Sequence, residues 1–179
     1  MKKNVTTCFL MIVAGCVLAA NDATVQRAEM KKLDWLLGQW RMSGWVESGP
    51  GKKLAVTGTT TVQSKLNGLV FLHESNNKIS GDGQSGKTNE EATFNVLCYD
   101  SNARNYLMRV LGDNGSSMEL RLRYEGGAWV LEPDSKQGDL YVRNTCKPDG
   151  KDAMVVVGEI SEDRRNWRKR MEFTYQRIK

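Results

Sequence analysis

The chain has few of the side chains that build metal centres and hydrolytic sites. It carries one histidine, His73, among 179 residues. A lone histidine excludes metal sites made of several histidines, and any Ser-His-Asp triad would depend on this one residue. No Gly-x-Ser-x-Gly nucleophile motif is present. The sequence therefore predicts no metal and no other cofactor, and an enzyme is the least favoured class of function.

Long apolar runs are also scarce. The longest, residues 8–20, is shorter than the ~20 residues that span a bilayer, and it follows the basic pair Lys2 and Lys3. This arrangement is typical of a secretory signal peptide. We therefore expect a signal peptide in residues 1–20 and one folded domain in residues 21–179. The working location is then the bacterial periplasm or outer membrane, or the medium after secretion.

Two cleavage sites fit this signal. The sequence Val13-Ala14-Gly15-Cys16 resembles the lipobox of bacterial lipoproteins, in which cleavage precedes a cysteine that carries acyl chains. A lipidated Cys16 would anchor the protein to a membrane. The alternative is ordinary cleavage after Ala19 or Ala20, beside small residues.

Two cysteines remain in the mature domain, Cys98 and Cys146. Export places them in an oxidising compartment, where a disulfide between them can persist. Their spacing does not show whether their β-carbons meet, and two separate thiols remain the alternative.

Neither charge nor motif predicts a polyanionic partner. The net charge is only +5, and Lys2 and Lys3 contribute two of those charges. We therefore expect no nucleic-acid partner.

Residues 81–88, GDGQSGKT, match the phosphate-loop pattern. That motif needs a following helix, whereas residues 91–99 have the composition of a strand, so we expect no nucleotide and interpret the segment as a polar loop.

The domain begins with one helix and continues as strands. Apolar residues recur at roughly helical spacing from Val25 to Leu37, and Gly38 then occupies the position of a C-cap glycine. Turn signals, among them Asn67-Gly68 and residues 112–115, separate ten segments rich in Val, Thr and aromatic residues. The predicted strands are residues 41–47, 54–63, 69–76, 91–99, 105–111, 118–124, 128–132, 139–146, 153–160 and 167–178.

Alternation within these segments indicates half-buried strands. Residues 118–124 place Met, Leu, Leu and Tyr on one face and Glu, Arg and Arg on the other. Consecutive hairpins without helices between them favour an antiparallel up-and-down barrel, because closure removes exposed sheet edges. The predicted fold class is all-β, a barrel of about ten strands with a short N-terminal helix.

The segment Leu33-Asp34-Trp35-Leu36-Leu37-Gly38-Gln39-Trp40 resembles the opening of a bacterial family of lipocalin-like domains of unknown function, which start with Leu-x-x-Leu-x-Gly-x-Trp. The closing segment, residues 161–175, is also similar. The resemblance covers residues 33–178 and implies a calycin-type barrel in which Trp40 packs across one end. A Gly-x-Trp start also occurs in haem-binding nitrobindins, but the late histidine of that family has no counterpart here, so haem is not expected.

Three residues are candidates for touching a ligand. His73 lies near the end of a strand and faces either the interior or the solvent. Arg109 and Arg143 interrupt apolar strands, and an inward arginine in a barrel can meet the carboxylate of an acyl ligand. Exposed or paired arginines are the alternative.

These observations favour an exported, non-catalytic protein that binds a small, mainly apolar or acyl ligand inside the barrel. The alternative is an interaction protein of the cell envelope whose barrel is filled by its own side chains. The interior volume distinguishes the two, because ligand pockets usually exceed ~300 Å³.

Overall fold

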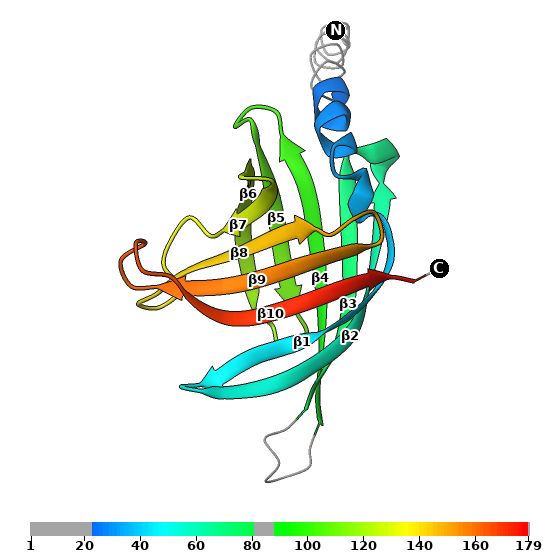
Figure 1. Cartoon of the computed structure of the whole chain (residues 1–179). Helices are drawn as coiled ribbons and strands as arrows, with labels where there is room; N and C mark the ends of the chain where they lie inside the picture. Colours follow the sequence, from blue (N-terminus) through cyan, green and yellow to red (C-terminus); the bar gives the residue numbers. More distant parts are fainter. Residues whose placement is uncertain (1–22, 81–87, 179) are drawn as a thin grey trace, which may run out of the picture.

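The computed structural model describes residues 23–80 and 88–178 and forms one closed antiparallel barrel (Figure 1). Each strand pairs with its neighbours in the chain, and β1 also pairs with β10 to close the barrel. The predicted all-β up-and-down barrel with a short N-terminal helix is confirmed. The strands are β1 (Gly38–Gly49), β2 (Lys52–Lys65), β3 (Val70–Ser80), β4 (Thr88–Asp100), β5 (Asn105–Gly112), β6 (Ser117–Glu125), β7 (Ala128–Glu132), β8 (Tyr141–Pro148), β9 (Ala153–Ser161) and β10 (Arg168–Arg177).

The N-terminal segment covers one end of the barrel. An α-helix over residues 23–31 leads into a 3-10 turn, η1 (Asp34–Leu36), and both lie at the same end of the barrel (Figure 1). Met30, Leu33 and Leu36 are buried there beside Trp40. Three residues per 3-10 turn keep Leu33 and Leu36 on one line, so both enter the core. The prediction that one helix continues to Leu37 is therefore wrong, because the α-helix ends at residue 31 and a 3-10 turn follows.

Polar contacts fasten this helix to the barrel. Gln26 Nε2 donates to the Leu69 carbonyl at 3.1 Å, and Arg27 Nε donates to the Asn67 carbonyl at 3.0 Å. Both acceptors lie in or beside η2 (Leu66–Gly68), the turn between β2 and β3. On the other side, the Tyr106 hydroxyl donates to Glu29 Oε2 at 2.8 Å.

Within the described residues, no helix combines the length and apolar character needed to cross a bilayer.

Trp40 is the third residue of β1 and is fully buried, and its indole N–H donates to the Leu36 carbonyl at 2.8 Å. The Arg177 guanidinium of β10 lies 4.2 Å from the Trp40 ring centroid. The same group donates to the Trp35 carbonyl at 2.7 Å and to the Leu37 carbonyl. Trp40 and Arg177 thus join the first and last strands beneath the N-terminal segment.

The hairpin of β3 and β4 is longer than predicted. The predicted strands were residues 69–76 and 91–99, but the ladder runs on to the pair Ser80 and Thr88. Lys78 and Glu90 face each other there, with Nζ and Oε1 3.0 Å apart. Backbone pairing needs no apolar side chain, so a polar hairpin extends past the core. Residues 81–87 of the phosphate-loop-like segment lie outside the described residues, as do the predicted signal peptide and Cys16.

Candidate functional site

A cavity of about 240 Å³ lies inside the barrel, beneath the N-terminal segment. Leu33, Trp35 and Leu36 line it at the covered end, and inward side chains of β2–β10 line the rest. No lysine, arginine, aspartate or glutamate is among the residues that line it. The volume is below the ~300 Å³ given above as the criterion for a ligand pocket, so the cavity does not meet that criterion, and the space suits at most a compact molecule rather than a long chain.

The cavity wall formed by β2, β3 and β4 is polar. Thr60, His73, Ser75 and Asn95 line it. Thr60 and Ser75 are register partners, and their hydroxyl oxygens are 2.8 Å apart, so they share a hydrogen bond. His73 is the register partner of Asn95 on β4. Side chains of register partners lie on the same face of a sheet, so all four face the interior together.

His73 is buried, with 8% of its surface exposed, and its Nε2 atom has no hydrogen-bond partner. Asn95 Oδ1 is likewise buried without a partner. Burial lowers the pKa of His73 to about 4, because the apolar surroundings disfavour the charged ring. The ring is therefore neutral at pH 7, and two side chains that line the cavity each carry a polar atom without a hydrogen-bond partner.

The opposite wall is mainly apolar and rich in sulfur, although Asn144 and Tyr175 also line it. Met108, Val110, Val156 and Phe173 are among its side chains. Cys146 also lines it, and the thiol lies 3.8 Å from the Met154 sulfur atom. Burial raises the pKa of Cys146 to about 12, so the thiol stays protonated at pH 7. One wall thus offers hydrogen-bonding groups, and the other offers polarisable apolar surface.

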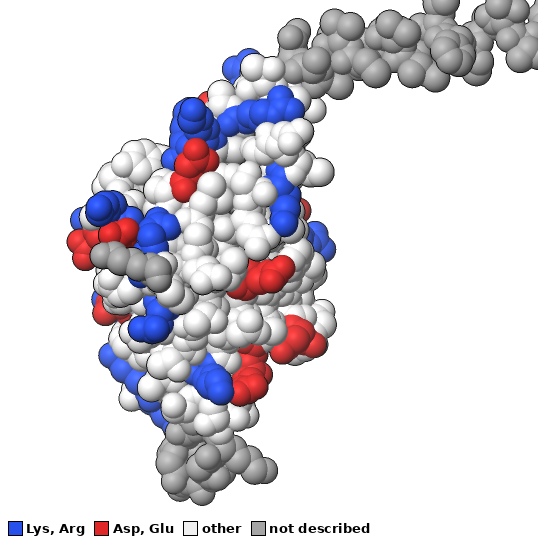
Figure 2. Space-filling view, turned by 90° about the vertical axis from the view of Figure 1, so that its right-hand side faces the viewer, with Lys and Arg blue, Asp and Glu red and all other residues white. Residues whose placement is uncertain are grey.

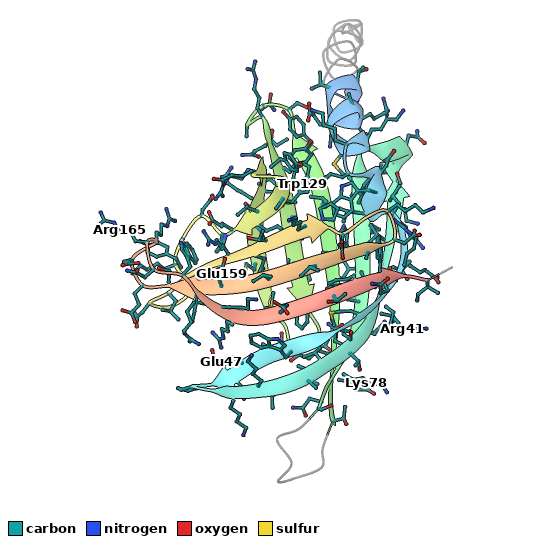
Figure 3. All side chains as sticks on the ribbon, viewed as in Figure 1. Arg41, Glu47, Lys78, Trp129, Glu159 and Arg165 are labelled. Carbon is teal, nitrogen blue, oxygen red and sulfur yellow. The ribbon has the colours of Figure 1, made fainter. Side chains whose placement is uncertain are left out.

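Trp35 and Trp129 separate the cavity from an outer cleft. Both indoles line the cavity, and both also line a cleft against the N-terminal helix that includes Glu29, Tyr106 and Tyr124. Figure 3 shows Trp129 near the end of the barrel that the helix covers. The Tyr106 and Trp129 rings meet edge to face, with centroids 5.2 Å apart. Trp35 and Trp129 therefore border both the cavity and the outer cleft.

The structure places the two candidate arginines on the outer face. Arg109 is exposed over 54% of its side chain and lies 3.7 Å from Glu119 on β6. Its chain neighbours Met108 and Val110 line the cavity instead. Arg143 is half-buried, donates to Glu159 Oε2 at 2.8 Å and lies 4.1 Å from the Trp167 ring centroid. Both arginines have carboxylate partners outside, and neither is among the residues that line the cavity.

Cys98 and Cys146 are free thiols. Cys98 follows Leu97, which is fully buried and faces inward, so the Cys98 side chain points outward from β4. Cys146 faces the cavity on β8. The two thiols thus lie on opposite faces of the barrel wall.

Among the described residues, no three histidine, cysteine, aspartate or glutamate side chains are grouped to hold a metal ion.

The face of the barrel in Figure 2 carries basic and acidic side chains scattered among uncharged ones. Several basic groups of the barrel are paired, for example Arg121 with Asp134 and Arg123 with Glu132. These pairs are exposed and contribute little to stability. The interior cavity is therefore the strongest candidate site.

The sequence pointed to His73 but missed Asn95. In the strand around Asn95, Phe94 and Val96 face one way, and Asn95 faces the other together with Leu97. An amide on the inward face of an apolar strand was the signal that could have identified it. Thr60 and Ser75 gave no comparable signal, since β2 and β3 are rich in hydroxyl and amide residues on both faces.

Comparison with known proteins supports the fold. Neither models of protein families nor curated protein sequences match this chain. Among solved structures, the S-type phycobiliprotein lyase CPES from Guillardia theta is similar, with a TM-score of 0.54 and 12% sequence identity. The match covers 83% of this chain and 92% of that one. The two proteins share a lipocalin-like barrel, and at this identity the similarity extends to the fold alone.

Proposed function

We propose that this protein binds a compact, mainly apolar and uncharged molecule inside its barrel, without catalysing a reaction. The observation that carries the proposal is the interior cavity of about 240 Å³, which is lined mainly by apolar side chains on one wall and by neutral polar ones on the other. An engineered cavity of ~150 Å³ in another protein accepts benzene. A substituted ring or a short branched chain therefore matches the space available here.

The lack of charge along the cavity lining argues for a neutral ligand. A carboxylate buried there would meet no cation, because the lining includes no lysine or arginine. Burying an unpaired charge is far more costly than burying a neutral polar group. The expectation of an acyl ligand held by Arg109 or Arg143 is therefore replaced by that of an uncharged one.

Two titratable groups of the lining support binding over catalysis. His73 has a pKa of about 4 and Cys146 a pKa of about 12, so neither changes protonation near pH 7. A general base works best with a pKa near the operating pH, and a cysteine nucleophile needs its thiolate. Both side chains are better suited to contact a ligand than to react with it.

We also propose that the protein is exported from the cytoplasm before it binds its ligand. The sequence of residues 1–20 supports secretion, with lipidation of Cys16 or ordinary cleavage after Ala19 or Ala20 as the two routes. The intact mass of the mature protein separates the routes. Lipidation adds the mass of acyl chains to a chain that starts at Cys16, whereas ordinary cleavage leaves an unmodified chain that starts at Ala20 or Asn21.

The experiment for the binding function uses a cavity-filling variant with a matched control. Val156 lines the cavity, whereas its chain neighbour Val157 points outward from the same strand, β9. Val156→Phe should abolish binding of toluene, measured by NMR titration, and Val157→Phe should leave it unchanged. Native mass spectrometry of the protein from its own host should also show a bound small molecule. Equal toluene binding by both variants would contradict the proposal.

The second candidate is an interaction protein of the cell envelope with no ligand. The small volume of the cavity is the observation that favours it, because many ligand pockets are larger. On this account the wild-type protein binds no toluene, and its native mass equals that of the mature chain alone. A protein partner would then have to bind the outer surface of the barrel.

A further inference from the structure

We propose that His73 and Asn95 form a polar subsite that recognises a hydroxyl group on a neutral, otherwise apolar ligand. This inference rests on the proposed binding function and specifies the chemistry of the ligand. It starts from the two side chains of the cavity wall whose polar atoms, His73 Nε2 and Asn95 Oδ1, are buried without partners.

Register brings these two atoms to one place. His73 on β3 lies directly across from Asn95 on β4, and both side chains line the cavity. His73 Nε2 and Asn95 Oδ1 do not hydrogen-bond to each other, because both atoms lack a partner. Both atoms are covered in the ligand-free structure, so binding would involve a rotation of the His73 ring and the Asn95 amide that turns them toward one polar group of a ligand in the cavity.

The neighbouring polar side chains are already satisfied. Thr60 and Ser75 are the next inward pair toward the middle of the barrel, and their hydroxyl oxygens share a hydrogen bond of 2.8 Å. Val62, the partner of His73 on β2, is apolar. The unmet hydrogen-bonding capacity of this wall is thus concentrated at His73 and Asn95.

A hydroxyl group fits this pair because it donates and accepts at once. The amide oxygen of Asn95 is an acceptor, and a neutral imidazole carries one N–H. A ligand hydroxyl would donate to Asn95 Oδ1 and accept from His73 Nε2–H, which requires the tautomer protonated at Nε2. A hydrocarbon would leave both atoms unsatisfied, and a carboxylate would bring two acceptors and a charge against the Asn95 oxygen.

The wall facing this subsite suits the rest of such a ligand. Met108, Val110, Val156 and Phe173 offer apolar contacts, and the protonated Cys146 thiol adds a soft, weakly polar one. A ligand with one hydroxyl at one edge and an apolar body therefore matches both walls. Phenols and alicyclic alcohols share this chemistry.

The test compares matched probes on the full mature chain. Dissociation constants for p-cresol, 4-methylcyclohexanol, toluene and 4-methylbenzoate are measured for the wild type and for His73→Phe and Asn95→Leu. The decisive quantity is the ratio of the p-cresol constant to the toluene constant, because it cancels changes in general affinity. Each variant should shift this ratio toward toluene by roughly tenfold, which corresponds to about 1.4 kcal/mol. Comparing the dissociation constant of 4-methylcyclohexanol with that of p-cresol shows whether the subsite prefers an alcohol or a phenol.

Two controls keep the outcome unambiguous. Asn77 also has a buried amide oxygen without a partner, but it is not among the residues that line the cavity, so Asn77→Ala should leave the ratio unchanged. His73 is the single histidine of the chain, so its ring resonances report contact directly in the wild type. They should shift more with p-cresol than with toluene, and the nitrogen spectrum should show the Nε2–H tautomer.

Contradictory outcomes separate the two proposals. An unchanged ratio in both variants, or equal shifts of the His73 resonances with p-cresol and toluene, would overturn the subsite while leaving the binding function intact. Tighter binding of 4-methylbenzoate than of p-cresol would also overturn it. Failure of all four probes to bind the wild type would instead overturn the binding function itself.

Discussion

The Arg177 guanidinium stacks over the Trp40 indole, 4.2 Å from the ring centroid, and thereby joins the last strand of the barrel to the first. The same guanidinium donates to the Trp35 and Leu37 carbonyls. One side chain thus holds the N-terminal segment, β1 and β10 together. The relationship explains why the Trp40 motif marks the architecture of the barrel rather than its ligand.

Replacing Arg177 should destabilise the protein substantially. Arg177→Met removes the cation–π contact and leaves two backbone carbonyls without their donors, so we expect a loss of about 2–4 kcal/mol in the free energy of unfolding. Arg121→Met is the matched control, because Arg121 is exposed and pairs with the exposed Asp134. That variant should lose less than about 1 kcal/mol. Equal losses in urea denaturation would refute the role assigned to Arg177.

Gly38 should tolerate no side chain. Its φ of +121° is unfavourable for other residues, and a Cβ there would lie 2.7 Å from Arg177 Nη1. We expect Gly38→Ala to lower the unfolding free energy by about 1–3 kcal/mol. Gly49→Ala, at a position with open space around it, should cost less than half as much. Thermal or urea unfolding of the two variants measures the difference.

The burial of His73 predicts a stability that falls as the pH is lowered. Its pKa is about 4 in the folded state and ordinarily 6.5, so the unfolded chain takes up its proton first. Stability is therefore complete above pH 6.5 and declines as the pH falls toward 4. From pH 7 to pH 5 the expected loss is about 2 kcal/mol.

The control for this dependence is His73→Phe. Between pH 7 and pH 5 most carboxylates stay ionised in both states, so this variant should show a nearly constant unfolding free energy. Urea denaturation at four pH values gives the comparison. A wild-type curve as flat as that of the variant would mean that His73 is solvated or paired rather than buried.

Cys146 should resist alkylation in the folded protein. Its pKa of about 12 leaves very little thiolate at pH 8, and the cavity also shields the sulfur. In a Cys98→Ser background we expect iodoacetamide to modify Cys146 at least about a hundredfold more slowly in buffer than in urea. Rapid modification of the folded protein, followed by mass spectrometry, would show that the cavity opens readily.

The sequence predicts the barrel well because its alternation is strong where one face is buried. In β6, Leu120 and Leu122 are buried between exposed Glu119, Arg121 and Arg123, as the alternation indicated. The end of the first helix was harder to predict, because Leu33 and Leu36 fit both an α-helix and the 3-10 turn that the chain adopts. Helical spacing alone does not separate these two conformations.

The site was less predictable than the fold for a physical reason. Arg109 lies between Leu107 and Leu111, so both faces of β5 are largely apolar and the alternation gave no direction. His73 could face either way until the register fixed it opposite Asn95. Which polar atoms lack partners depends on contacts between strands, and a single sequence does not contain them.

The most direct test of the account locates a bound probe inside the barrel. Intermolecular nuclear Overhauser effects from p-cresol ring protons should reach the methyl groups of Val110, Val156 and Met154, which line the cavity. They should not reach Val155 or Val157, which point outward on β9. Contacts confined to outward side chains, or no intermolecular contacts at saturating p-cresol, would contradict the claim that this barrel is a binding protein for a small neutral molecule.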